Sequence, residues 1–164
     1  RVHRLTLLAA FLALATMAAQ PAAAQGAEVA FGGAGQARDL PVEITADNLT
    51  VNQNDGAAEF TGDVVIGQGD MRLSAPRVRV IYRENSDRIA RLEATGGVTL
   101  VSGDDAAEAA RADYDVENGT IDMRGDVLLV QRNTTLTAER MTVDTVAGTA
   151  RMSGRVKTVI GTGD

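Results

Sequence analysis

A short phrase, glycine followed by any residue and then valine, recurs four times and constrains the fold more than any other feature. Its copies begin at Gly62, Gly96, Gly125 and Gly154, so that successive glycines lie 34, 29 and 29 residues apart. Each copy follows a second phrase in which apolar and polar residues alternate and which ends in valine. Two strand-like phrases in each repeat of about 30 residues are typical of a repeated β-hairpin architecture.

Residues that favour turns separate these phrases. Residues 54–56 and the pair Asn118 and Gly119 tolerate positive φ, and Asn-Gly between alternating apolar residues is a strong hairpin signal. No helix-length amphipathic segment follows residue 25, which predicts a fold that is nearly all β. Two stretches are less regular. Pro76 predicts a sheet edge or a bulge, and the alanine-rich residues 106–112 are compatible with a helical turn.

The first residues have the order of a secretory signal peptide: a basic head, an uncharged apolar run and an Ala-x-Ala cleavage site. The alternative is a membrane anchor, but the apolar run has about 15 residues and a spanning helix needs roughly 20. We therefore expect a signal peptide at residues 1–24, a flexible leader at residues 25–39 and one folded domain at residues 40–161.

The side chains offer little catalytic chemistry. The chain has 164 residues and a net charge of −6, contains no cysteine, and has its one histidine, His3, in the predicted signal peptide. These absences exclude Ser-His-Asp and Cys-His sites, as well as histidine or thiolate metal sites, from the mature chain. We expect no metal and no cofactor, and the acidic balance argues against nucleic-acid binding.

Carboxylate pairs leave one enzymatic alternative, cleavage of an envelope glycan. Asp113 with Asp115, or Asp104 with Asp105, would then have to face each other across a cleft. Acids this close in sequence are more typical of a solvated strand or turn. We expect no catalytic residue and predict that the protein is not an enzyme.

A basic stripe has two interpretations. Arg72, Arg77, Arg79 and Arg83 alternate with apolar residues and would therefore lie on the face opposite the core. The stripe is either a solvated outer face with cross-strand ion pairs or a contact surface for an anionic head group.

The apolar residues of the strands are mostly aliphatic. A sheet with such residues on one face can close on itself around a filled core. If the sheet stays splayed, the same residues line a slot for acyl chains, whose burial contributes about 0.8 kcal/mol per CH₂. Both arrangements are compatible with the pattern.

Five phrases in a fixed order resemble the OstA-like domain family. They are Ala46 and Asp47, the phrase FTGDV from Phe60, LSA from Leu73, Tyr-x-Val from Tyr114 and MRGDV from Met123. The resemblance covers residues 40–160, nearly the whole mature chain, and includes the bridge protein of lipopolysaccharide transport. It implies an open, twisted antiparallel β-jellyroll of repeated hairpins that binds lipopolysaccharide through the acyl chains of lipid A.

The resemblance also implies where lipid binds. By position, the groove of the family falls on Val42, Ile44, Leu100, Tyr114 and Val116. Alternation along the strands adds further inward residues to this expected lining: Phe60, Val64, Ile66, Leu73, Val80, Met123, Leu129 and Met141.

Segments of this family join end to end by pairing edge strands, which implies docking edges at residues 41–46 and 155–160. The edge residues are Val42, Ile44, Val156, Thr158 and Ile160. The expected partners are lipopolysaccharide, further copies of this chain, an inner-membrane export complex and an outer-membrane translocon, and the expected location is the periplasm. Two alternatives are a membrane-anchored relative in the same pathway and a structural β-repeat module of the envelope that binds no lipid.

Overall fold

Strands form all the regular structure in the residues that the computed structural model describes, 26–32 and 40–162. The expected all-β fold is confirmed, and eleven strands form one antiparallel sheet. They are β1 (Ala27–Ala30), β2 (Glu43–Thr45), β3 (Asn48–Val51), β4 (Ala58–Gln68), β5 (Met71–Tyr82), β6 (Ile89–Ser102), β7 (Asp105–Asp115), β8 (Thr120–Gln131), β9 (Thr134–Asp144), β10 (Thr149–Ser153) and β11 (Lys157–Ile160).

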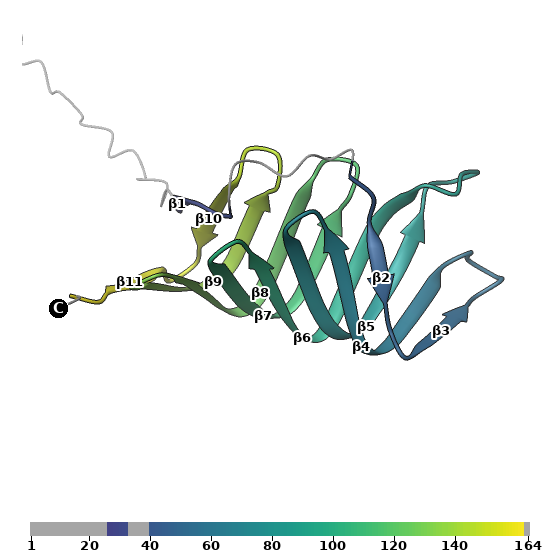
Figure 1. Ribbon diagram of the computed structural model, residues 1–164, viewed down its shortest axis with the longest axis horizontal. Coiled ribbons are helices and arrows are strands. Elements are labelled where there is room, and N and C mark those ends of the chain that lie inside the picture. Colours follow the sequence, from purple (N-terminus) through teal and green to yellow (C-terminus); the bar gives the residue numbers. More distant parts are fainter. Residues whose placement is uncertain (1–25, 33–39, 163–164) are drawn as a thin grey trace, which may run out of the picture.

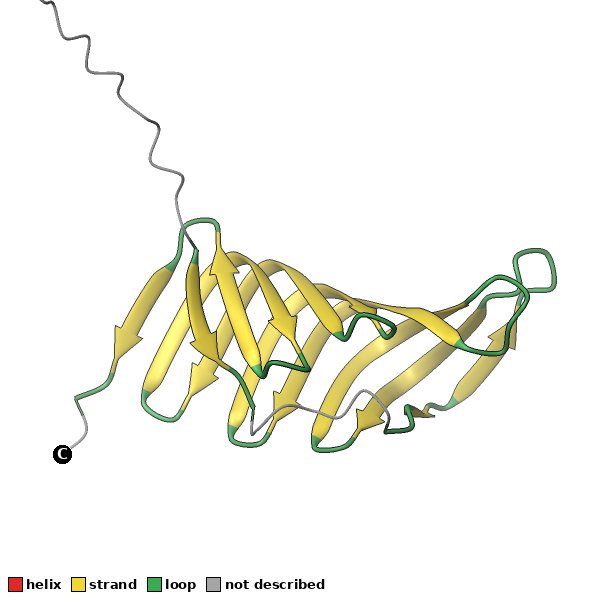
Figure 2. Ribbon diagram, turned by 90° about the horizontal axis from the view of Figure 1, so that it is seen from above, coloured by secondary structure: helices red, strands yellow, loops and turns green. Residues whose placement is uncertain are grey.

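The strands follow one another across the sheet almost as they do along the chain. Strands β4 to β9 are neighbours in sequence order. At one end β2 and β3 share the edge of β4, and at the other end β10 and β11 share the edge of β9. Figures 1 and 2 show the result from the side and from above, a twisted sheet that rolls on itself.

Every long strand bends near its middle, and the recurring glycine phrase forms the bend in every second strand. Gly62 and Asp63 have positive φ (81° and 45°), as do Gly125 and Asp126 (87° and 48°). The pairing register shifts at the same places, which marks a β-bulge and a change of strand direction. The 29-residue spacing therefore arises because each hairpin contains one glycine bend.

The bends divide the sheet into two parts whose inner faces share one apolar core. Half-sheet A contains residues 27–30, 48–51, 58–61, 77–82, 89–95, 111–115, 120–124, 140–144 and 149–153. Half-sheet B contains residues 43–45, 64–68, 71–75, 98–102, 105–109, 127–131, 134–138 and 157–160. The row of bends joins the two half-sheets along one side. The opposite side, where the hairpin turns of both lie, is called the seam below.

A side chain at a bend glycine is expected to destabilise the fold. A Cβ at Gly125 would lie 2.7 Å from the Cβ of Ala110, whereas one at Gly97 (φ 95°) meets nothing within 4 Å. We expect Gly97→Ala to cost about 1–2 kcal/mol for the positive φ alone. Gly125→Ala should cost about 1–3 kcal/mol more because of overpacking. Urea denaturation of both variants checks this, and equal costs would contradict the close approach.

Two irregular stretches are strands. The alanine-rich residues 106–112 lie within β7, so the helical turn was wrong: Ala107, Ala109 and Ala112 face the core while the residues between them face outward. Tertiary pairing on both sides overrides the helix propensity of alanine here. Pro76 lies within β5, an interior strand, where the register shifts, so the expected bulge is confirmed and the edge is not.

The leader differs from expectation where the structure describes it. Residues 27–30 form β1 and pair with β10, and Phe31 is 4% exposed in the core. The reason is that Val29 and Phe31 alternate inward and cover the last inner residues of β10. The predicted signal peptide and residues 33–39 lie outside the described residues. In the parts that are described, no helix is both long and apolar enough to cross a membrane.

Candidate functional site

All thirteen predicted groove residues lie on the inner face of the roll. Nine of them are fully buried: Val64, Ile66, Leu73, Val80, Leu100, Tyr114, Met123, Leu129 and Met141. Four are half-buried and pack against the same cluster: Val42, Ile44, Phe60 and Val116. The structure therefore brings the predicted set together on one continuous apolar surface.

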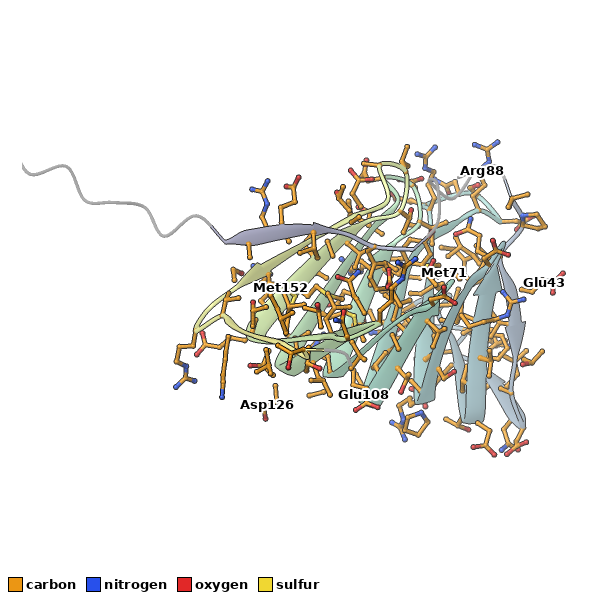
Figure 3. The ribbon with its side chains drawn as sticks, turned by 60° about the vertical axis from the view of Figure 1, so that its left-hand side comes forward. Glu43, Met71, Arg88, Glu108, Asp126 and Met152 are labelled. Atoms are coloured by element: carbon orange, nitrogen blue, oxygen red, sulfur yellow. The ribbon has the colours of Figure 1, made fainter. Side chains whose placement is uncertain are left out.

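Further residues share this surface and were not predicted. They are Phe31, Met71, Val78, Leu92, Val98, Ile121, Val127, Leu136, Val143 and Met152. All but Phe31, which lies in the segment expected to be a leader, belong to predicted strands with the same two-residue alternation, so that signal could have found them. Figure 3 shows Met71 and Met152 inside the roll, while Glu43, Arg88, Glu108 and Asp126 lie at its surface.

The interior is a filled core in this structure. Along the middle of the roll, inner side chains such as Ile66, Leu100 and Met123 have no water-accessible surface. The two half-sheets thus interlock, and an acyl chain could enter only if they moved apart. The sequence pattern could not distinguish this state from an open slot.

One polar bridge crosses the seam. The Tyr114 hydroxyl at the end of β7 in half-sheet A donates to Oε1 of Gln68 at the end of β4 in half-sheet B. Nε2 of Gln68 donates to the Leu40 carbonyl at 3.0 Å. Burial raises the pKa of Tyr114 above its ordinary value, despite a hydrogen bond with Thr145, so the hydroxyl stays protonated and able to donate. Buried polar groups satisfied in this way fasten the two half-sheets together.

The seam opens into a hollow near the bridge. Leu40, Pro41, Val42, Ile89 and Val116 line it with apolar surface, and its volume is about 630 Å³. Three charged residues complete the rim: Asp87, Arg88 and Glu117. Two predicted groove residues, Val42 and Val116, therefore line this hollow, and both also pack against the core.

Both ends of the sheet expose apolar residues of the inner face. At the end formed by β3, Leu49 and Val51 are 56% and 60% exposed. They stand opposite the inward residues Phe60 and Ala58 and so extend the core surface to the edge. At the other end Ile160 of β11 is 68% exposed.

The arginines of the basic stripe are engaged locally. Arg77, Arg79 and Arg83 form ion pairs with Glu59, Asp55 and Glu117 at 3.7, 2.6 and 2.6 Å. Arg72 donates to the carbonyls of Gly69 and Met71. These contacts favour a solvated outer face with ion pairs over a head-group site.

The carboxylates of the enzymatic alternative have structural contacts. Asp113 pairs with Arg111 on the outer face, and Asp115 accepts hydrogen bonds from Asn118 in the following turn. Although burial pushes the pKa of Asp115 upward, the hydrogen bonds from Asn118 and Glu117 and the charge of Arg91 hold it below its usual value. Asp105 accepts a hydrogen bond from the Gly32 amide.

Comparison with known proteins decides the family. Residues 43–149 match the model of the family described as LptA/(LptD N-terminal domain) LPS transport protein. The chain belongs to this family. The match spans the sheet from β2 to the start of β10 and includes the bends, the polar bridge and twelve of the thirteen predicted groove residues.

Two curated proteins are similar to this chain over different lengths. An uncharacterised protein of Rhizobium meliloti (strain 1021) is 28% identical over 155 residues, which cover 87% of this chain and 83% of that protein. The LPS-assembly protein LptD of Actinobacillus pleuropneumoniae serotype 5b (strain L20) is 42% identical over 69 residues, or 42% of this chain and 8% of that protein.

A solved structure confirms the expected β-jellyroll. It is LptH of Pseudomonas aeruginosa, described as the LptA homologous periplasmic component of the lipopolysaccharide transport device. The TM-score is 0.66 at 19% sequence identity, with 76% of this chain and 97% of LptH covered. The protein is thus an LptA-like member of the LPS transport family with an open antiparallel jellyroll.

Proposed function

We propose that this protein is a periplasmic carrier that holds the acyl chains of lipid A along its inner face. It would pass lipopolysaccharide from an inner-membrane export complex to an outer-membrane translocon. The observation that carries the proposal is the inner face itself, apolar from β3 to β11 and exposed at both ends. A carrier needs such a face because burial of each CH₂ group contributes about 0.8 kcal/mol without any directional contact.

Loading would begin at the seam. The hollow around Val42 and Val116 offers apolar surface beside charged residues, which suits a lipid with apolar tails and a polar head group. Since the core behind it is filled, the half-sheets would separate as acyl chains replace side-chain contacts. The Gln68–Tyr114 bridge would have to open first, because it joins the two half-sheets at the seam.

Joining of copies end to end would use the free sheet edges. A strand edge presents unpaired N–H and C=O groups that another strand can satisfy. Of the predicted edge residues, Ile44 in β2 pairs with β4 at one end, and Thr158 and Ile160 in β11 pair with β9 at the other. Val42 and Val156 come directly before these two strands. Pairing between these edges would also join the inner faces of two copies into one longer apolar surface.

A photo-crosslinking experiment tests lipid binding. Residues Ile44 and Thr45 are neighbours in β2, but Ile44 faces the core and Thr45 faces solvent. A photo-reactive amino acid at position 44 should capture lipopolysaccharide in intact cells, with at least about tenfold less capture at position 45, because adjacent strand residues point to opposite faces. Val116 and the exposed outward residue Val130 give a second matched pair that controls for hydrophobicity.

Absence of any adduct at positions 44 and 116 would reject the carrier. The filled core would then fit a structural envelope module that binds no lipid. The membrane-anchored alternative is separated by another measurement. Mass spectrometry of the exported protein should find an N-terminus near residue 25, and an intact leader would support the anchored form.

A further inference from the structure

The N-terminal strand β1 occupies an edge at the far end of the sheet from its sequence neighbour β2. It pairs with β10 through four opposed residue pairs, from Ala27 opposite Met152 to Ala30 opposite Thr149. In Figure 3, β1 (purple) runs along the margin of the roll above the labelled Met152. The other pairings in the sheet join strands that are adjacent or next but one along the chain, so this pairing of distant segments calls for a separate explanation.

Contacts of β1 and the residues after it tie both half-sheets together. The Phe31 amide donates to the Gly148 carbonyl in half-sheet A's last hairpin turn, at 2.9 Å. Nε2 of Gln131 in half-sheet B donates to the Ala30 carbonyl at 2.6 Å, and the Gly32 amide donates to Asp105 at 2.8 Å. Residues 26–32 therefore close the seam at this end of the roll.

Strand β3 offers the same pattern of side chains and hydrogen-bonding groups as β1. In β1 the Phe31 N–H faces β10, and with a period of two the N–H of the inward residue Val29 faces it as well. In β3 the Asn52 N–H faces β4, so the N–H groups of Leu49 and Val51 point away, to the free edge. Leu49 and Val51 are also the residues on the inner face. On both strands, therefore, the inward apolar residues are the ones whose N–H groups are free to bond to β10: those of β1 already face β10, and those of β3 point to an unpaired edge.

Strand direction would also allow β3 of a second copy to take the place of β1 beside β10. Each neighbour in the sheet is antiparallel, so β10 runs parallel to β4. Because β3 is antiparallel to β4, β3 of a second copy continued in register beyond β10 would be antiparallel to β10, just as β1 is. In that position Leu49 and Val51, now exposed, would cover the inner residues that Val29 and Phe31 cover.

We propose that β1 is an intramolecular cap that takes the place of β3 of a second copy at the edge of β10. The cap must leave before the half-sheet A edges of two copies can pair, whereas β11 stays available on half-sheet B. The proposal rests on the end-to-end joining described under the proposed function. The cap is short, has one ion pair (Arg151 with Glu28 at 2.6 Å) and buries one large side chain, Phe31. A strand of this length is marginal by itself, which suits a displaceable element.

The test locks the cap with an introduced disulfide. The chain has no native cysteine that could form a competing disulfide. Glu28 and Arg151 are opposite each other on the outer face and, by the alternation above, form a non-hydrogen-bonded pair, whose Cβ atoms lie close. The variant is E28C/R151C. The matched control is E59C/R79C, which replaces another opposed glutamate and arginine, also a non-hydrogen-bonded pair, between β4 and β5. Strands β4 and β5 stay paired in the proposed association, so this disulfide should not affect it.

Light scattering after size-exclusion chromatography measures association of the full chain against concentration. Oxidised E28C/R151C should need at least about tenfold more protein to associate than wild type, and reduction should restore wild-type behaviour. The oxidised control should match wild type. A release variant, Val29→Asp with Phe31→Ser, should associate at about tenfold lower concentration, with its melting curve recorded as a check on folding.

Three results would overturn the cap. Equal association of locked and wild-type protein would show that β1 does not compete. Disulfides that link two copies on a non-reducing gel would show that β1 pairs between chains instead. No association by any variant would remove end-to-end joining and the cap with it, whereas lipid capture at Ile44, measured separately, would still stand.

Discussion

Replacing Leu100 by aspartate is expected to unfold the protein. Leu100 lies in the middle of β6 with 0% exposure, and no cation among the described inner-face residues could pair with a carboxylate there. Burial of an unpaired charge, added to the loss of a packed leucine, should cost more than about 4 kcal/mol. The neighbouring Val101 is 37% exposed on the outer face, opposite Arg72, so Val101→Asp should change stability by less than about 1 kcal/mol.

Circular dichroism and urea denaturation of the two variants measure the difference. A folded Leu100→Asp variant with near wild-type stability would mean that water reaches the middle of the roll, and the interior would then be a wet slot. The pair of variants thus tests the filled core directly, at adjacent positions of one strand. It also bears on lipid loading, because a filled core has to be opened and a slot does not.

Proline at position 158 is expected to block end-to-end joining without unfolding the chain. The Gly161 N–H donates to the Asn133 carbonyl, so with a period of two the N–H of Val159 also faces β9 and that of Thr158 faces the free edge. Thr158→Pro removes a donor that only a partner strand would use, and its ring obstructs an incoming strand. We expect at least about tenfold weaker association, or about 1.4 kcal/mol.

Val159→Pro is the matched variant for this prediction. It removes the N–H that faces Thr135 of β9, so it should detach β11 and lower the stability of the monomer by roughly 1–3 kcal/mol. Sedimentation velocity measures association, and thermal melting measures stability. If Thr158→Pro associated as wild type does, joining would not use the β11 edge.

The fold was largely predictable because its signals are local. Alternation with a period of two identifies inward residues such as Val64, Leu73 and Met123 without knowledge of their partners. The glycine phrases predicted the repeat as well. Their role as bends was not predicted, because a positive φ at Gly62 and Asp63 becomes a corner only when the adjacent strands bend at the same level.

Contacts between distant segments were the part that the sequence could not predict. Phe31 is buried by β10, whose residues follow it by more than 100 positions, and the surrounding glycines and alanines resemble a linker. The Gln68–Tyr114 bridge depends on two half-sheets facing each other across the seam. Alternation places both residues on the inner face, but it does not show that they meet across the seam.

The order of the strands allows the length of the roll to vary independently of the strands at its two ends. From β4 to β9 each strand pairs only with the strands before and after it, so a duplicated unit of 29 residues could extend the sheet with the same kind of strand pairing. The roll would become longer by one hairpin, with β2 and β3 still at one end and β10 and β11 still at the other. The length of such a roll can therefore change by gain or loss of whole hairpins, without a change to the strands at either end.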